Sequence, residues 1–490
     1  MNPHFPERLG WRGLVPKKFS VRPVCLALWL AAGAIVPAQA TDLIQAWQSA
    51  QNHDLDFLAA QSAHDAGQTQ REQSSALWRP NVQASATAGR MTSDTQTQGA
   101  QFFAPALAGG SAINGANFNT SINNGTLDRW SLTARQPLLN GERLAQSRQL
   151  DTKAQMADLQ WQQARQTLMV QTAQRYFDVA LAQEALRVAR QQEQSVQKAL
   201  EEIRHRYELG DAPITDTHEA TARWEAIRAQ VLAAETELQL KQAALSDATG
   251  IPSTQCVVME PLAGTLPRSP QTLSQWEEAV AAGNPQVQLQ RLQVTLAHEE
   301  NARFSALSSP SVDLVGEMTR DHLSGSGDYG AAANNLHTAM VGVQLNIPLY
   351  SGGMRSARHE ETRLLANKAA EDAARAQQQV ALQTRAAWLG LNTGHARVAA
   401  LEAALRATEN RLSATRLGHQ LGERSTLDLL NAESDAANAR LAWLQARVAL
   451  LMNRLQLSDL AGHLEQAQLE EINALLEPAA NTEQYLTGGN

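Results

Sequence analysis

His359 and Glu360 come nearest to a catalytic motif in this chain. A histidine followed by a glutamate opens the zinc-protease pattern, which a second histidine four residues after the first completes. No histidine follows His359 at that spacing, so we interpret the pair as part of a solvated helix face. The other histidines show no metal-ligand spacing, and no glycine-rich phosphate loop is present. The sequence therefore predicts no enzyme, no metal site and no cofactor.

Two pairs of matched segments organise the sequence. Pro137, in QPLLNG, is matched 211 residues later by Pro348, in NIPLYSG, and Gly210, in GDAPITD, is matched 212 residues later by Gly422, in GERSTLD. In each half 73 or 74 residues separate the proline from the glycine, with no proline between them. Each interval predicts one helix of roughly 68 residues, on the order of 100 Å long. The matched halves indicate an internal two-fold repeat with an elongated helical architecture.

A shorter helix is expected at the start of each half. Residues 41–79 and 273–309 predict helices that each end before a proline. Asn52 and Asn284 lie at similar distances from those prolines, so we expect them to be equivalent positions.

Alternating side chains after these helices predict β-strands. In 338–347 one face is apolar and the other is mostly polar over about ten residues, which is typical of a transmembrane strand. Weaker alternation occurs in three other segments. The Gly-, Asn- and Ser-rich stretches 117–125 and 324–330 predict the loops between strands. The regular apolar face disfavours the alternative, that these segments are disordered linkers between coiled coils.

The predicted organisation has four parts. Residues 1–40 form a signal peptide, 41–262 a first repeat, 263–475 a second repeat and 476–490 a tail. Each repeat ends in a coiled-coil helix whose apolar residues follow a 3-4 spacing. The expected ranges are strands at about 81–91 and 128–137 with helices at 141–209 and 213–250 in the first repeat, and strands at about 311–320 and 338–348 with helices at 353–421 and 424–457 in the second.

The first forty residues have the features of a secretory signal. Five Lys and Arg residues precede a short apolar run that leads to Ala38-Gln39-Ala40. Removing this segment also removes one Glu, so the net charge changes from −8 to −12, which argues against nucleic-acid binding. Cys256 would be the one cysteine left, so no intrachain disulfide is predicted.

The predicted order of elements resembles that of the TolC family of outer-membrane efflux and secretion channels. A signal peptide is followed by two repeats, each with a helix, two strands, a very long helix, a tight turn and a coiled-coil helix. The specific signals are the QPLLNG and IPLYSGG turns, the Tyr176-Phe177 pair and the run from Arg206 to Gly210. The segment 455–475 and the lack of a lipid-attachment cysteine look more like TolC than like the lipid-anchored members.

The resemblance implies a mixed α and β membrane protein in the bacterial outer membrane. Three protomers would each give four strands to one twelve-stranded transmembrane β-barrel, continuous with a periplasmic α-helical coiled-coil barrel. The implied partners are a periplasmic membrane-fusion adaptor, an inner-membrane ABC or proton-driven pump, and outer-membrane lipid. Elementary physics agrees with a homotrimer, because four strands cannot close alone and open edges do not survive in lipid. Trp130 fits an interfacial aromatic belt.

The matched prolines and glycines are expected to shape the chain. Proline lacks the strand-ladder donor yet suits the first helical turn. We therefore expect strand-to-helix turns at Pro137 with Gly141 and at Pro348 with Gly352.

The resemblance places a gate at the periplasmic tip, where Gly210 and Gly422 turn the chain. The residues that fall at gate positions are Asp216, His419, Arg424, Asp428 and Asn431. Threefold symmetry would make Asp428 a carboxylate ring that draws cations, and Arg424 would pair with Asp216 across neighbouring coiled coils. His419 stands where TolC has an aromatic hydroxyl and Asn431 where it has a second aspartate. The alternative is that Asp216 and Asp428 are ordinary helix caps.

Two questions of function stay open. Within the channel class, type I protein secretion and multidrug efflux compete. From another class, a periplasmic coiled-coil scaffold without a pore would share the helical pattern, although the alternating strands disfavour it.

Overall fold

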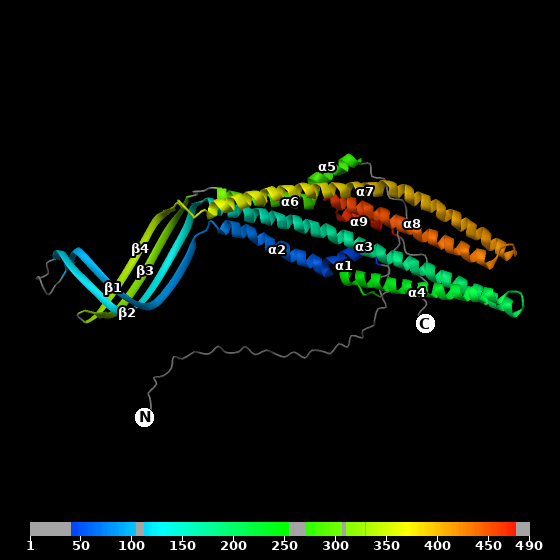
Figure 1. The fold of residues 1–490 in the computed structure, drawn as a ribbon, viewed down its shortest axis with the longest axis horizontal. Helices are drawn as coiled ribbons and strands as arrows, with labels where there is room; N and C mark the ends of the chain where they lie inside the picture. The colour runs from blue at the N-terminus through cyan, green and yellow to red at the C-terminus, as the bar shows by residue number, and fades with distance from the viewer. Residues whose placement is uncertain are drawn as a thin grey trace, which may run out of the picture. The chain divides into compact units, whose positions relative to one another are not determined.

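The computed structural model describes residues 41–103, 112–253, 258, 271–305, 310–328 and 330–476. The expected signal peptide, Cys256 and residues 477–490 of the expected tail lie outside the described residues. The first half contains α1 (Leu43–His53), α2 (Leu55–Ala76), β1 (Asn81–Phe103), β2 (Ala112–Asn140), α3 (Gly141–Glu208) and α4 (Ile214–Thr249). The second half contains α5 (Leu273–Gly283), α6 (Pro285–Ser305), β3 (Ser311–Gly327), β4 (Gly330–Asn346), α7 (Met354–Gln420), α8 (Thr426–Leu460) and α9 (Gln466–Asn473). The described elements thus follow the same order in both halves, with α9 added at the end (Figure 1).

Each strand pair leads into a very long helix. α3 has 68 residues and α7 has 67. α3 begins directly after β2, where Asn140 Oδ1 accepts a hydrogen bond from the backbone N of Arg143 (3.0 Å). α7 follows Gly353, whose φ of 82° lies in the left-handed region that favours glycine. The two long helices therefore start differently: a side-chain cap precedes α3, and a glycine with positive φ precedes α7.

The matched prolines do not both mark the switch from strand to helix. Pro137 lies inside β2, next to a register shift between Pro137 and Leu139. A register shift suits a residue that has no N–H to give to the ladder. Pro348 lies in the irregular stretch between β4 and α7, beside Gly352 with a φ of 63°. The switch to helix falls at Gly141, where the predicted helix begins, but the predicted strand end at 137 is wrong by three residues, because β2 continues past the register shift to Asn140.

The helix at the start of each half is broken in two, which the sequence did not predict. The breaks fall at Asp54 and Asn284, which are extended, with ψ of 117° and 120°. Each residue ends one helix and caps the next: Asp54 Oδ1 accepts from Phe57 N (3.0 Å), and Asn284 Oδ1 accepts from Val287 N (3.0 Å). The expected equivalence of Asn52 with Asn284 is therefore wrong, because Asp54 holds that place.

All four strands extend further toward their hairpin ends than predicted. β1 and β2 have 23 and 29 residues, and β3 and β4 have 17 each. Most of the stretches 117–125 and 324–330, expected as loops, pair as strand. Their Ser, Thr, Asn and Gly residues are typical of turns, but backbone hydrogen bonds do not require apolar side chains, and register shifts absorb the irregularities of β1 and β2.

The four strands form one antiparallel sheet in the order β1-β2-β3-β4. Its register places two kinds of residue on opposite faces. One face carries exposed apolar side chains, namely Val82, Leu132, Leu314, Met318, Val341, Val343 and Leu345. The other face carries hydrogen-bonded polar groups, including the two-bond pair of Arg129 with Asp321 (2.7 Å each) and the Ser85–Ser131 hydroxyl pair (2.7 Å). β1 and β4 each have a neighbour on one side within the sheet.

The helices share a buried core around the middle of α3. α3 packs against α2, α4, α6 and α8, and α7 packs against α6 and α8. Tyr176 and Phe177 are fully buried with edge-to-face rings, and the Tyr176 hydroxyl donates to the carbonyl of Thr41 (2.9 Å). None of the described helices combines the length and apolar character that a membrane crossing would need.

Replacing Asn284 with Ala should lower the free energy of unfolding by about 2 kcal/mol. The change removes the cap of α6 and the hydrogen bond from Asn284 Nδ2 to the carbonyl of Leu460 (2.8 Å). Asn52→Ala is the matched control, because Asn52 is exposed and donates within its own helix to Gln48. It should cost less than about 0.5 kcal/mol. Thermal unfolding of the purified variants measures both, and equal losses would contradict the cap assignment.

Candidate functional site

The two helical hairpins turn in the same way. Gly210 and Gly422 have φ of 85° and 78°, in the left-handed region. After Gly210, the backbone N of Asp211 donates to the carbonyl of Arg206 (2.8 Å), and after Gly422 the N of Glu423 donates to the carbonyl of Gly418 (2.8 Å). These bonds satisfy carbonyls that the helix ends would leave free. Each glycine thus brings two long helices back side by side.

Asp428 closes a capping box at the start of α8. The backbone N and the hydroxyl of Ser425 both donate to Asp428 Oδ2 (3.2 and 2.9 Å), and Asp428 N donates to Ser425 Oγ (3.1 Å). These hydrogen bonds from Ser425, followed by the nearby positive charge of Arg424, lower the pKa of the Asp428 carboxyl. Asp428 is therefore the capping-box partner of the N-cap residue Ser425, and these contacts favour its ionised form.

Asp216 has a looser setting at the start of α4. Pro213 precedes this helix and gives no side-chain cap. The Asp216 carboxylate accepts a hydrogen bond from the neighbouring Thr215 hydroxyl (3.3 Å). A carboxylate in the first turn is favourable next to the helix dipole. The two hairpin turns thus differ. A capping box of Ser425 and Asp428 stabilises the start of α8, and no capping box is present at the start of α4.

The two hairpins are joined near their tips by side chains of one chain. Arg223 Nη2 of α4 donates to Asn431 Oδ1 of α8 (2.8 Å), and the Thr426 hydroxyl donates to Glu202 of α3 (3.4 Å). His419 Nε2 lies 3.2 Å from the same Thr426 hydroxyl. Asn431 and His419 are therefore brought into a polar contact zone between the hairpins.

The expected pair of Arg424 with Asp216 is not formed within one chain in the part of the chain that the structure describes. Arg424 lies instead in the hairpin turn, with its backbone N donating to the carbonyl of Gly418 (3.2 Å). Sequence reasoning missed Arg223, which makes the link across the hairpins. The signal available was its position, two helical turns after Asp216, on the helix that faces Asn431.

A buried carboxylate joins the hairpins further from the tips. Glu184 of α3 is fully buried and accepts two hydrogen bonds from Arg187 (2.6 Å each) and one from Arg440 of α8 (2.7 Å). Lys241 of α4 pairs with Asp178 of α3 (3.4 Å), whose charge and hydrogen bond raise the pKa of the Lys241 ammonium. Charge pairs therefore fix α3 against both α4 and α8.

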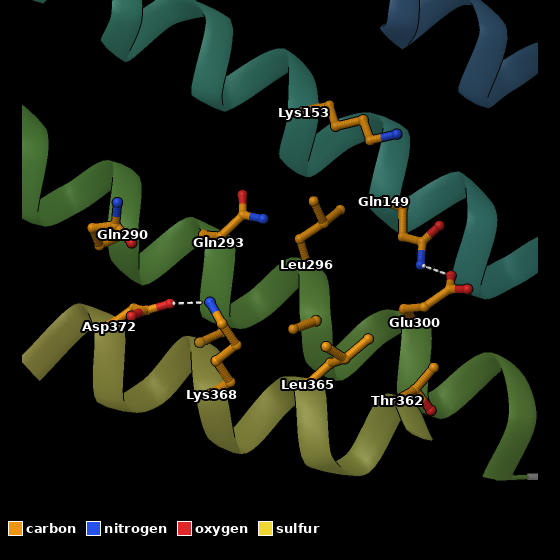
Figure 2. Close-up of a pocket in the computed structure, with 12 residues that line it drawn as sticks. Gln149, Lys153, Gln290, Gln293, Leu296, Glu300, Thr362, Leu365, Lys368 and Asp372 are labelled. Carbon is orange, nitrogen blue, oxygen red and sulfur yellow. Dashed lines mark hydrogen bonds and ion pairs between the residues drawn. The ribbon is translucent and has the colours of Figure 1, made fainter. Parts of the chain in front are cut away.

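A cavity of about 410 Å³ lies between α3, α6 and α7 (Figure 2). Leu296 and Leu365 lie among longer polar side chains. Glu300 accepts a hydrogen bond from Gln149 (2.7 Å), and Lys368 pairs with Asp372 (2.7 Å). Across the described residues, no group of three or more His, Cys, Asp or Glu could hold a metal ion. This lining offers neither a nucleophile next to a base nor a metal site.

A second cavity, of about 420 Å³, lies between α7 and the end of α8 and is lined by Gln383, Asn453, Gln456 and Asp459 among others. Burial raises the pKa of the Asp459 carboxyl to about 6. Asp459 also lies near the C-terminal end of its helix, where a negative charge is unfavourable. The equivalent residue near the end of α4, Asp247, is exposed.

Comparison with known proteins decides what this fold is. The model of a family described as outer membrane efflux protein matches residues 46–251 and 276–463. The chain belongs to this family. It is 31% identical to the proteases secretion protein PrtF of Dickeya chrysanthemi, over 90% of this chain and 92% of that protein. It is 27% identical to the outer membrane protein TolC of Vibrio cholerae, over 67% of this chain and 76% of that protein.

The fold also matches a solved outer-membrane channel. The crystal structure of CmeC from Campylobacter jejuni has a TM-score of 0.67 at 15% identity, covering 89% of this chain and 90% of that one. The resemblance to TolC, the outer-membrane location and the function as an outer-membrane export channel are confirmed. Membership of a channel family decides against the scaffold without a pore.

Replacing Glu184 with Ala should destabilise the fold by about 3 kcal/mol, because it leaves two arginines without their buried partner. Glu360→Ala is a matched control. Glu360 makes the same two-bond pair with Arg363 three residues later (2.8 and 2.7 Å), but both side chains are exposed. That change should cost less than about 1 kcal/mol. Thermal unfolding that gave equal losses would show that burial adds nothing to the Glu184 cluster.

The raised pKa of Asp459 predicts a pH dependence of stability. Between its ordinary pKa of 3.8 and its folded value of about 6, the folded protein holds a proton that the unfolded chain releases. The contribution of Asp459 to stability therefore falls as the pH rises through this window. Asp459→Asn should stabilise the protein at pH 7 by about 1–3 kcal/mol and have little effect near pH 3.5. Asp247→Asn should have little effect at either pH, and a pH-independent gain for Asp459→Asn would contradict the assignment.

Proposed function

We propose that three copies of this chain form one channel that exports proteins across the outer membrane in type I secretion. The sheet of each copy would give four strands to a twelve-stranded barrel. The long helices of the duplicated halves would form a periplasmic tunnel. The open β1 and β4 edges are the observation that carries the proposal.

Backbone groups explain why the edges matter. Hydrocarbon offers no hydrogen-bond partner, and each unsatisfied backbone group costs several kcal/mol there. The apolar face around Val341, which is 80% exposed, and Val343, which is 66% exposed, favours contact with lipid. Pairing β4 of one copy with β1 of the next would satisfy both edges. The polar face, with Arg129 and Asp321, would then line a water-filled lumen.

Protein secretion is favoured over drug efflux by the extent of similarity. The relative whose name refers to protease secretion matches 90% of this chain, whereas TolC of Vibrio cholerae matches 67%. A type I route would join the channel to an ABC pump through a periplasmic adaptor. Deleting the gene should abolish the appearance of one or more proteins in the culture medium without changing drug susceptibility. The reverse pattern would assign the channel to efflux.

The hairpin tips are the proposed gate. In a trimer, Asp216, His419, Arg424, Asp428 and Asn431 would each occur three times around the pore. The bond of Arg223 with Asn431 would hold the hairpins of one copy together, and Arg424 would be free to reach Asp216 of a neighbouring copy. A threefold set of Asp428 carboxylates would attract cations.

Depth in the membrane gives a test of the barrel. Arg in place of Val343, on the apolar face, should cost about 2–4 kcal/mol if the residue lies near the bilayer midplane. Arg in place of Gln344, on the polar face next to Arg135, should be tolerated. Trimer yield in outer-membrane fractions and heat resistance of the trimer measure both changes. Equal damage at the two positions would mean that these faces do not separate lipid from lumen.

Single-channel conductance tests the gate. Arg223→Ser should raise the open fraction, because it removes the link between α4 and α8. A partly exposed link contributes about 1 kcal/mol or less, so three links would shift the equilibrium by at most about 150-fold. Arg228→Ser is the control, since Arg228 pairs within α4 with Glu225 (3.8 Å).

Two further variants separate the gate roles. Arg424→Ser should also raise the open fraction, and Asp428→Ala should weaken block by multivalent cations from the periplasmic side. Unchanged conductance in both the Arg223 and the Arg424 variants would show that neither arginine helps to hold the gate closed. Unchanged cation block would leave Asp428 as a helix cap.

A further inference from the structure

A row of basic and aromatic side chains crosses the apolar face of the sheet. The register pairs Trp130 of β2 with Arg320 of β3, and Arg320 with His337 of β4. Residues paired across strands share a face, so all three lie on the face that also carries Met318 and Val341. Trp130 is 64% exposed, and Arg320 and His337 are exposed as well. A guanidinium, an imidazole and an indole thus adjoin an exposed apolar surface.

The position of this row along the strands is set by distance. Counted from Ile347, the residue directly after β4, His337 lies ten residues toward the strand hairpin. At about 3.4 Å per residue and a tilt of about 40°, ten residues rise about 26 Å. The apolar band of an outer-membrane barrel is about 25 Å tall. The row therefore lies at the far boundary of that band, on the side of the strand hairpins.

Arg320 differs from the arginines on the opposite face. Arg129 is paired with Asp321 and Arg135 donates to Gln344 (3.4 Å). No ion pair or hydrogen bond within the described residues engages the Arg320 guanidinium. Asp128, on the next row toward the hairpins, forms no ion pair with it. A cation at the edge of an apolar surface is favourable when an anion lies next to it.

We propose that Arg320 and His337 bind the phosphate of a lipid headgroup in the outer leaflet, with Trp130 alongside at the headgroup level. The inference rests on the proposed function, since it requires the apolar face to contact a bilayer. The acyl chains would lie on the apolar rows around Met318 and Val341, while the phosphate accepts hydrogen bonds from the guanidinium and imidazole. A free phosphate ion would contact only the basic side chains of this surface. These side chains are open to solvent and do not enclose an ion. The site is therefore a lipid site.

Native mass spectrometry of the purified full-length trimer in detergent tests this site. The probes are diphosphorylated lipid A and the same lipid with its phosphates removed. Wild type should bind the phosphorylated lipid more tightly. Arg320→Gln should weaken that binding by about tenfold, the usual effect of losing a charge-assisted hydrogen bond. Arg320→Lys should retain most of it, and His337→Gln should reduce it by a smaller factor. Arg129→Gln removes the same charge at the same level of the opposite face and should leave lipid binding unchanged.

Several results would overturn the site. Equal binding of the two lipids by wild type, or equal losses for Arg320→Gln and Arg129→Gln, would show no role for the Arg320 row. Inorganic phosphate that bound alone as tightly as the lipid would identify a free-anion site instead. A protein that formed no trimer in outer-membrane fractions would fail the proposed function, which is a separate outcome from an inserted trimer that lacks phosphate selectivity.

Discussion

The free edges of β1 and β4 are the constraint on which the rest of the structure depends. An antiparallel sheet with an apolar face can lie against lipid only if every backbone group has a partner. The chain offers no further strand within the described residues, and β2 and β4 lead into helices that cannot pair with a sheet edge. In the proposed trimer, the partners of both edges come from neighbouring copies. In the proposed trimer, closure by further copies would also fix where the helices start, because the helices adjoin the sheet at the same end.

The helices pack closely although few large side chains are buried between them. Small residues carry much of this packing. A Cβ added to Gly67 of α2 would collide with the Cβ of Ala157 of α3, so the backbones of these helices approach closely. Many buried residues of α3 are alanines, and its largest buried side chains, Tyr176 and Phe177, occur where α1 and α4 also pack. Where small residues do not suffice, charge pairs such as Glu184 with Arg440 hold the helices in register.

Local features of the sequence predicted much of this fold. The proline-free intervals and the glycines at positive φ act within a few residues, so the two long helices and their turns were visible without a structure. The capping alternative for Asp428 was also local, since Ser425 lies three residues away. The strand pairs were found from alternation, but their ends were not, because polar strand segments have the composition of loops.

Long-range partners could not be predicted. Arg440 lies 256 residues after Glu184, and Arg223 lies 208 residues before Asn431. No periodicity links such pairs, and each partner alone looks like a solvated helix residue. The break at Asp54 was hidden for a related reason: an aspartate within a helical pattern is common, and only the docking of α1 onto α3 and α4 shows that the chain must turn there.

The two interpretations of Asp428, helix cap and pore carboxylate, support each other. Three carboxylates around a narrow pore would raise one another's pKa and favour protonation. The hydrogen bonds from Ser425 act in the opposite direction, because they stabilise the ionised form and lower the pKa. They also hold Oδ2 in place, so the charge stays at a fixed position along the helix. In the proposed trimer, the cap would therefore be what keeps a ring of like charges ionised.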